Sequence, residues 1–267
     1  MNPRPATVLI GPGRLGRSLA GALHAAGWPV LGVFGKDDVL GVPTTALATA
    51  LAEAELVIFT VPDRAIAPLA PRLLAPHHLA LHMSGATPSA ALREHAAPKA
   101  VAACHPLQSF GAETSPPEHF QGVAFALEGE PLALGVAREL VSALGGWHFE
   151  LDLETAPDGK RLYHAGCALA SNGLVALVHR AVQLFGAAGV PESVATAALG
   201  SLVLGTARNL TTASSPADVL TGPVARGDTA VVDGHRDAID MAAPEVRGIY
   251  DAVTAELEDL VRHRGAR

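Results

Sequence analysis

The chain has 267 residues, of which 49% are hydrophobic and 17% are charged, and its formal net charge is -7 at pH 7. This length is sufficient for one large or two medium domains, and the composition excludes a mostly disordered chain. The acidic balance, without a cluster of Lys and Arg, argues against nucleic acid or an anionic membrane as the main partner.

The cysteines and histidines give no sign of a metal site. Cys104 and Cys167 are far apart and match no metal or redox spacing. His77, His78 and His82 lack the cysteine or carboxylate spacing of a zinc site, so we interpret them as core or surface histidines. The chain start has no long apolar segment typical of a signal peptide, and we find no uniformly apolar membrane span. We therefore expect a cytoplasmic protein without a metal.

The first half of the chain alternates short apolar runs with helical stretches. We predict helices at 15–26, 64–74, 89–95 and 132–144. We predict strands at 6–10, 30–34, 56–60, 79–82, 100–103, 123–127 and 147–151. This alternation is typical of a largely parallel sheet covered by helices on both faces.

A glycine-rich turn separates the first predicted strand from the first helix. Gly11, Pro12, Gly13, Arg14, Leu15 and Gly16 fit the pattern G-x-G-x-x-G. In dinucleotide-binding domains the first glycine permits the sharp turn, the second makes room for a pyrophosphate, and the third lets the helix pack on the strand. The helix N-terminus also offers free N–H groups to the phosphates. We therefore predict a Rossmann dinucleotide-binding domain with these six residues at the cofactor, although a glycine turn that binds nothing is the alternative.

The end of the second predicted strand bears on the choice of cofactor. Gly35 and Lys36 stand where an NAD-binding protein usually carries an acidic residue for the ribose hydroxyls. A cation suits the 2′-phosphate of NADP, so we predict NADP, with Gly35 and Lys36 in contact with it. Asp37 and Asp38 keep NAD possible, and a solvated turn lysine explains Lys36 equally well.

Other predicted strands also end in polar or turn-forming residues. A histidine followed by proline, His105, comes after the fifth strand and suits substrate binding or proton transfer, or else a structural turn. Ligands gather at the carboxyl ends of parallel strands. We therefore predict further cofactor contacts at Thr60, Val61, Pro62, Ser84 and Gly85.

After residue 154 no further strand pattern appears. Helices are predicted at 158–187, 191–210, 229–240 and 245–262. The first of these is apolar almost all round, so we expect a central, buried helix. The predicted fold class is therefore α/β, with a Rossmann domain at 1–153 and an all-α substrate and dimerisation domain at 154–267.

Several motifs carry a resemblance to known reductases. The stretches LFGAAGVPESVATAALGSLVLGTARNL (184–210) and SPADVLTGPVARGDTAVVDGHRDAI (215–239) resemble the C-terminal helical domain of pyrroline-5-carboxylate reductases. CHPLQSF, KRLYHAGCALASN and LTGPVARGD are similar to motifs of Rossmann-like plus DUF2520 proteins, which are relatives of those enzymes and of F420-dependent NADP reductases. The resemblance covers most of the chain. It implies a helical domain of the 6-phosphogluconate dehydrogenase C-terminal type and a homodimer formed through it.

The chain departs from the pyrroline-5-carboxylate reductases at one substrate loop. Their Gly-Gly-Thr-Thr, which contacts the imino acid, is replaced here by ARGDT at 225–229. Gly227 and Thr229 carry over, and Arg226 adds a cation suited to a substrate carboxylate. The resemblance therefore implies a rebuilt substrate pocket with Arg226 and Thr229 in it.

Lys160 and His164 lie four residues apart in a predicted helix, so they share a face that Cys167 and Ser171 continue. A lysine in an apolar helix is costly unless it is at the rim or faces a site. The arrangement resembles hydroxyacid dehydrogenases, where a Lys and an Asn one turn apart lie beside the nicotinamide. Here His164 takes the place of that Asn, and Asn172 is a less well-aligned neighbour. Alternatively, Lys160 starts the helix in water and His164 is a core histidine.

Together these features predict an NADP-dependent oxidoreductase that transfers a hydride between nicotinamide and a small carboxylate-bearing carbonyl compound. A ketopantoate-like 2-oxo acid is the first choice and a cyclic imino acid the second. A prephenate-dehydrogenase-like reaction, F420 as a second redox partner, and a non-catalytic dinucleotide sensor stay open. The predicted catalytic residues are Lys160, His164 and His105, and the predicted substrate-binding residues are Ser171, Asn172, Arg226 and Thr229.

Overall fold

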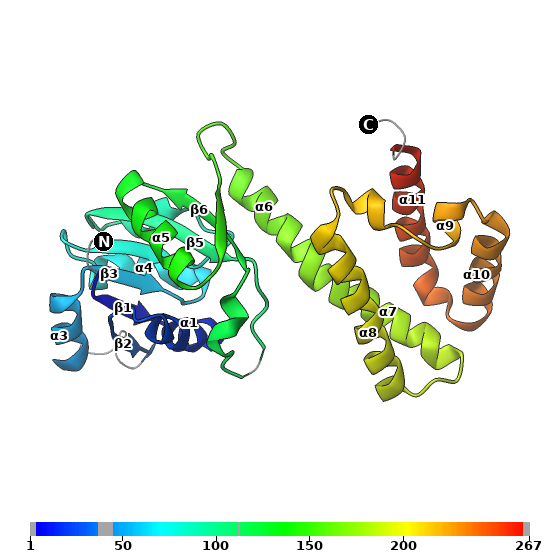
Figure 1. Cartoon of the computed structure of the whole chain (residues 1–267), viewed down its shortest axis with the longest axis horizontal. Coiled ribbons are helices and arrows are strands. Elements are labelled where there is room, and N and C mark those ends of the chain that lie inside the picture. Colours follow the sequence, from blue (N-terminus) through cyan, green and yellow to red (C-terminus); the bar gives the residue numbers. More distant parts are fainter. Residues whose placement is uncertain (1–3, 37–44, 112, 264–267) are drawn as a thin grey trace. The chain divides into compact units, whose positions relative to one another are not determined.

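The computed structural model describes residues 4–36, 45–111 and 113–263 (Figure 1). The chain forms two compact units, Met1–Ala168 and Leu169–Arg267. We call them the sheet unit and the helical unit. The functional division predicted at 153/154 stays a prediction.

The sheet unit contains a seven-stranded sheet in the order β2-β1-β3-β4-β5-β6-β7. Its strands are β1 (Thr7–Ile10), β2 (Val30–Phe34), β3 (Leu56–Phe59), β4 (Leu79–His82), β5 (Ala100–Pro106), β6 (Ala124–Gly129) and β7 (Trp147–Glu150). Neighbours are parallel except β5 and β6. Ile10, Phe59, His82 and Ala103 are aligned in register, so the carboxyl ends of β1, β3, β4 and β5 share one edge of the sheet.

Helices cover both faces of this sheet, as predicted. They are α1 (Arg14–Ala25), α3 (Thr45–Glu53), α4 (Asp63–Leu73), α5 (Pro131–Ala143) and the 3-10 helices η1 (Ser89–Arg93) and η2 (Pro117–Phe120). Buried residues of α1 and α5 pack on one face, and those of α3, α4 and η1 pack on the other. The α/β fold class is confirmed, although α3 was not predicted and the helix expected at 89–95 is a short 3-10 helix.

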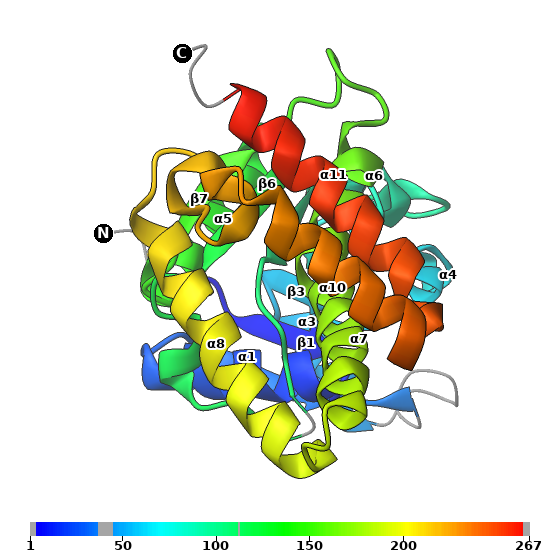
Figure 2. The ribbon, with the colours of Figure 1, turned by 90° about the vertical axis from the view of Figure 1, so that its right-hand side faces the viewer.

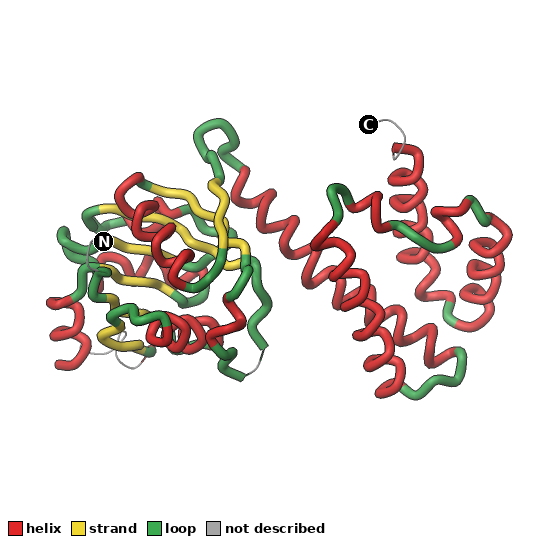
Figure 3. Tube along the Cα trace, viewed as in Figure 1, coloured by secondary structure: helices red, strands yellow, loops and turns green. Residues whose placement is uncertain are grey.

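The described elements of the helical unit are all helical, with the strands confined to the sheet unit (Figure 3). Here α6 (Gly159–Ala168) ends the sheet unit, and a π-helical turn (Leu169–Gly173) begins the helical unit. The helical unit continues with α7 (Leu174–Ala187), α8 (Glu192–Thr212), η4 (Pro216–Val219), α9 (Pro223–Arg226), α10 (Thr229–Ala242), η5 (Pro244–Val246) and α11 (Arg247–His263). Helices α10 and α11 run side by side (Figure 2).

The expectation that 158–187 forms a central, buried helix is wrong for this chain. Lys160 is the one buried residue of α6, and α7 has none. The core cluster around Ile239 in the helical unit is small, so the unit does not cover its own apolar helices. The helical run Gly159–Ala187 has a mean hydropathy of 1.3 in its most apolar window, which is not buried. By length and composition alone, this run among the described residues could cross a membrane.

Candidate functional site

The glycine turn between β1 and α1 is held by Thr60 at the end of β3. Gly11 has φ +115°, and a Cβ there would lie 2.7 Å from the Thr60 carbonyl oxygen. The Thr60 hydroxyl donates to the Gly11 carbonyl at 2.7 Å. A Cβ on Gly16 would lie 1.9 Å from that same Gly11 carbonyl, so α1 packs tightly under the turn. These contacts allow only glycine at both positions.

The N-terminus of α1 is open toward a ligand. Gly13 is the N-cap and makes no side-chain capping bond, so the first N–H groups of α1 receive no side-chain cap. A Cβ on Gly13 would meet nothing within 4 Å. An uncapped helix N-terminus beside open space is a ready anion site, and this fits the pyrophosphate of a dinucleotide.

A cavity of about 630 Å³, which we call the dinucleotide cavity, opens beside this turn. Its apolar wall includes Phe34, Pro68 and Leu69, while Arg64 and Arg72 add cations from α4 that the sequence analysis did not single out. The predicted cofactor-binding residues in its lining are Gly11, Pro12, Gly13, Gly35, Lys36, Thr60, Val61 and Pro62. Asp37 and Asp38, which kept NAD possible, lie outside the described residues.

The remaining predicted cofactor residues lie beside this cavity or further along the strand ends. Arg14, Leu15 and Gly16 form the first turn of α1. Ser84 follows β4, and its hydroxyl accepts hydrogen bonds from the N–H groups of Ala86 and Thr87 at 3.2 and 2.9 Å. Ser84 therefore shapes the turn that carries Gly85.

Gly85 lies against two histidine rings. A Cβ there would come 2.6 Å from Cδ2 of His164 and 2.8 Å from Cε1 of His105. The two rings are 6.0 Å apart between centroids and are tilted at 74°. Nδ1 of His105 and the hydroxyl of Tyr163 are 2.6 Å apart. The structure thus gathers His105 from β5, Tyr163 and His164 from α6, and Gly85 from the β4 end.

Lys160 is buried and paired with Glu128 on β6. Its Nζ donates to Oε1 of Glu128 at 2.7 Å, and the two side chains are 3% and 6% exposed. The backbone N–H and the hydroxyl of Ser89 also donate to the Glu128 carboxylate, each at 2.7 Å. Burial raises the pKa of Glu128, but Lys160 and Ser89 outweigh it and hold that pKa below its usual value. Burial lowers the pKa of Lys160, although Glu128 opposes this.

Two histidines near this pair are held neutral. Burial, followed by the charge of Lys160, lowers the pKa of His82 to about 4. Burial, then His164 and then Lys160, lowers the pKa of His105 to about 4. Nδ1 of His82 accepts from the Ser84 N–H at 3.2 Å, whereas its Nε2 is buried without a hydrogen-bond partner. The Pro88 carbonyl raises the pKa of His82, but its geometry falls short of a hydrogen bond.

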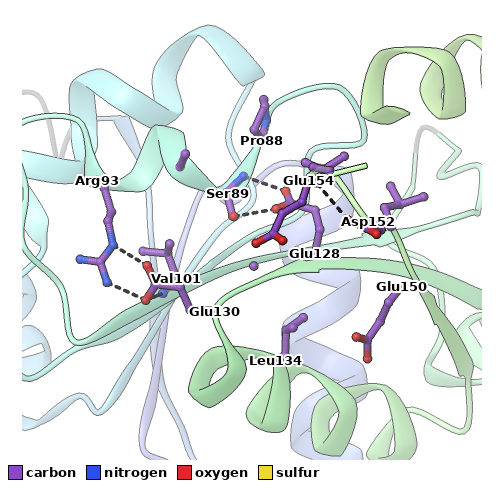
Figure 4. A pocket seen from close by; sticks show the side chains of 14 residues that line it. Pro88, Ser89, Arg93, Val101, Glu128, Glu130, Leu134, Glu150, Asp152 and Glu154 are labelled. Atoms are coloured by element: carbon purple, nitrogen blue, oxygen red, sulfur yellow. Dashed lines mark hydrogen bonds and ion pairs between the residues drawn. The ribbon is translucent and has the colours of Figure 1, made fainter. Parts of the chain in front are cut away.

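A second cavity, of about 650 Å³, lies between η1, β5, β6 and residues 150–154; we call it the Glu128 cavity (Figure 4). It shares no lining residue with the dinucleotide cavity. The lining carboxylates are Glu128, Glu130, Glu150, Asp152 and Glu154. Glu130 is paired with Arg93, as the dashed lines in the figure show.

The structure brings two predicted catalytic residues, His105 and His164, together in the sheet unit, and Lys160 is near enough for its charge to lower the pKa of His105. The predicted substrate-binding residues lie in the helical unit instead. Ser171 and Asn172 are exposed in the π-helical turn, Arg226 ends α9, and Thr229 begins α10.

Glu128, Ser89 and Tyr163 were not predicted from the sequence. Glu128 left a signal, because it is a single acid in an otherwise apolar strand and such a charge needs a partner. Its partner Lys160 is one of two adjacent cations, with Arg161, in the first turn of α6. Their pairing depends on tertiary contacts between segments 32 residues apart. Ser89 and Tyr163 gave no comparable signal.

Comparisons with known proteins agree with this architecture. Residues 123–257, just over half of the chain, match the family described as Domain of unknown function (DUF2520). No curated protein matches the chain. Protein TM1727 from Thermotoga maritima is similar in structure, with a TM-score of 0.74 and 23% identity over 97% of this chain and 99% of that one.

Two further solved structures share the fold. One is a candidate NADP oxidoreductase, BF3122 from Bacteroides fragilis, with a TM-score of 0.69 and 21% identity over 96% of this chain and 98% of that one. The other is the pyrroline carboxylate reductase of Plasmodium falciparum with NADP bound, with a TM-score of 0.59 and 11% identity over 97% and 99%. At these identities the likeness shows the fold.

Proposed function

We propose, from the premise that the chain belongs to the DUF2520 family, that this protein is an NADP-dependent oxidoreductase acting on a small carboxylate-bearing carbonyl compound. One observation carries the proposal. The dinucleotide cavity lies at the carboxyl ends of β1, β2 and β3, and the cluster of His105, His164 and Lys160 lies by the ends of the next strands, β4 and β5. A dinucleotide that starts at the glycine turn and extends along this edge would reach the cluster.

The chain's own residues supply the features that hold NADP(H). The uncapped N-terminus of α1 suits the pyrophosphate, and the open space at Gly13 lets it approach the backbone. Lys36 and Arg64 line the same cavity and suit the 2′-phosphate. Bound NADPH would supply the hydride. The Plasmodium enzyme and an imine reductase from Myxococcus stipitatus were solved with NADP, and BF3122 is described as an NADP oxidoreductase, which supports NADP, whereas a ketol-acid reductoisomerase from an uncultured archaeon with this fold prefers NADH.

Lys160 is the proposed proton donor. Hydride addition to a carbonyl carbon places negative charge on oxygen, and a nearby ammonium stabilises that charge and then gives up its proton. Burial lowers the pKa of Lys160, which makes its ammonium a stronger acid. His105 and His164 orient the substrate on either side of Gly85, and Tyr163 fixes the His105 ring.

The substrate class is proposed from the sequence. Arg226 stands in the loop predicted to bind substrate and its guanidinium suits a carboxylate, so we place a 2-oxo acid first. A cyclic imine is the second candidate, because several proteins of similar structure are pyrroline carboxylate or imine reductases.

The test is a screen of the purified protein with NADPH against 2-oxo acids and cyclic imines. We expect turnover of a 2-oxo acid, and Lys160→Ala to lower that turnover by about 100-fold or more with NADPH affinity unchanged. Lys99→Ala, which removes an exposed lysine, is the matched control. Full turnover in Lys160→Ala would show that another residue donates the proton. NADPH binding without turnover of any compound would favour a dinucleotide sensor.

The helical unit also supports a proposal of a homodimer. Val175 on α7 and Leu202 on α8 are 69% and 66% exposed, and several other Leu and Val residues of these helices are exposed too. Monomeric proteins rarely expose apolar surface so widely, and the same face of a second copy could cover it. A membrane is the other possible cover for the run Gly159–Ala187. Sedimentation of detergent-free protein as a dimer would distinguish the two, since a membrane helix would aggregate or need detergent. The cytoplasmic location stays a prediction.

A further inference from the structure

Lys160, the proposed proton donor, needs a source of protons. Each reduction of a carbonyl consumes one proton, so Lys160 must be recharged before the next turnover. The lysine side chain is only 3% exposed, so bulk water does not reach it directly. A buried donor of this kind needs a second group that exchanges protons with water and passes them on.

Glu128 contacts Lys160 and also lines a cavity. Its Oε1 accepts a hydrogen bond from Nζ of Lys160, and the same residue lines the Glu128 cavity (Figure 4). That cavity has about 650 Å³ of space, enough for many waters, and no residue of the dinucleotide cavity belongs to its lining. Water could therefore reach Glu128 by a route separate from the one through which the cofactor enters.

We infer that Glu128 relays protons from water in the Glu128 cavity to Lys160. The inference rests on the proposed function, in which Lys160 gives its proton to the reduced substrate oxygen. Once Lys160 is neutral, the Glu128 carboxylate takes a proton from hydronium in the cavity and leaves water. The Glu128 carboxyl then gives that proton to the Lys160 amine and returns to the carboxylate, which restores the ion pair, so each turnover moves one proton from solvent to substrate.

The groups around the pair suit Glu128 better than its neighbours for this role. Ser89 on η1 donates two hydrogen bonds to the carboxylate and fixes its direction. His82 on β4 does not compete, because its Nδ1 accepts from the Ser84 N–H and burial lowers its pKa to about 4, which keeps the ring neutral. Cys104 on β5 is fully buried, and Asp63 on α4 acts on Lys160 only as a charge.

Proton exchange can be measured without any substrate. The sequence has three lysines, and Lys36 and Lys99 are exposed, so the slowly exchanging ammonium signal in a heteronuclear NMR spectrum belongs to Lys160. The observable is the exchange rate of the Lys160 Nζ protons with water near neutral pH. The relay requires that this rate depend on the carboxyl group of Glu128.

Glu128→Gln is the decisive variant, because glutamine can still accept from Lys160 and the Ser89 N–H and donate to the Ser89 hydroxyl, yet cannot carry a proton. We expect it to slow exchange by about tenfold or more, in the range of lost acid–base catalysis. Glu130→Gln is the matched control, since Glu130 lines the same cavity but is paired with Arg93. An unchanged rate in Glu128→Gln, or equal slowing in both variants, would overturn the relay.

Ser89→Ala gives a second test if Glu128→Gln does not fold. Loss of the hydroxyl bond raises the protonated share of Glu128, so exchange at Lys160 should become faster. A rate that stays the same or falls would contradict the relay. These rates do not depend on turnover, so a failed substrate screen would remove the proposed function and leave the proton route to be decided separately.

Discussion

Strands β1, β3 and β4 of the sheet unit bury every residue, whereas α7 of the helical unit has no buried residue, although both segments are strongly apolar. A strand in a parallel sheet is covered by the crossover helices of its own chain, so its apolar run and its burial go together. A helix in a small bundle has no such guaranteed cover. An apolar sequence therefore indicates where a core is possible, while the number of neighbouring elements decides whether one chain completes it.

The two units also differ in how deeply their ion pairs are buried. The sheet unit holds the pair of Lys160 and Glu128 in its interior, whereas the helical unit keeps its network of Arg236, Arg247 and Asp251 at the surface. Breaking a buried pair leaves one charge without solvent or partner, while water replaces the partner of an exposed one. The same kind of substitution should thus have unequal effects in the two units.

Lys160→Met should produce the largest loss of stability, about 3–5 kcal/mol, because it leaves Glu128 buried without its cation. Both tryptophans, Trp28 and Trp147, lie in the sheet unit, so urea unfolding followed by their fluorescence reports on that unit. The double variant Lys160→Met/Glu128→Leu should recover most of the loss. Arg247→Met is the control; because the helical unit has no tryptophan, its unfolding is followed by far-UV circular dichroism, and its midpoint should stay nearly unchanged. An equal loss in both single variants would contradict the difference between the units.

The sheet unit should also lose stability in mild acid, by about 3 kcal/mol for His82. The folded pKa of His82 is lowered from 6.5 to about 4, so its contribution is complete above pH 6.5 and is lost as the pH falls toward 4. In that window the unfolded chain takes up a proton that the folded chain does not. Urea midpoints between pH 7 and pH 4 measure the slope.

His82→Asn keeps an acceptor for the Ser84 N–H and should reduce this slope, leaving the part that comes from His105. His148, on the edge strand β7, is exposed, and His148→Asn is the matched control. A slope that His82→Asn leaves unchanged would place the acid sensitivity elsewhere, with His105 the next group to replace.

The sheet and the glycine turn were predictable because they depend on local patterns. Short apolar runs gave the seven strands, and the spacing of Gly11, Gly13 and Gly16 gave the turn. Strand β5 was predicted to end at residue 103, whereas it extends to Pro106. Its last residues are held by antiparallel pairing with β6, which no local pattern reveals. The candidate site was predictable as isolated polar residues at strand ends and in an apolar helix. The pairing of Lys160 with Glu128 was not predictable, because the two residues lie 32 positions apart and meet only in the folded chain.

Leu202→Glu in the helical unit should weaken the proposed dimer by about 100-fold or more, since it would bury a charge in an apolar interface. Sedimentation over a range of concentrations measures this. Leu132→Glu is the matched control, because Leu132 is also an exposed apolar residue, 51% exposed, but lies on α5 of the sheet unit. A wild-type monomer at micromolar concentration, or equal weakening by both variants, would refute the idea that the helical unit is completed by a second copy.

The smallest expected effect concerns the cations of the dinucleotide cavity. Lys36→Glu should reduce the preference for NADPH over NADH by about tenfold, since an exposed charge acts on the 2′-phosphate through solvent and at modest strength. Calorimetric titration with both dinucleotides measures the ratio, and Lys99→Glu makes the same change of charge away from the cavity. Arg64 lines the cavity from α4, so Arg64→Ala in the Lys36→Glu background should reduce the ratio further. Equal affinity of the wild-type protein for both dinucleotides would contradict the choice of NADP. A preference that survives both substitutions would assign the 2′-phosphate to other groups and leave the glycine turn as the common anchor for either cofactor.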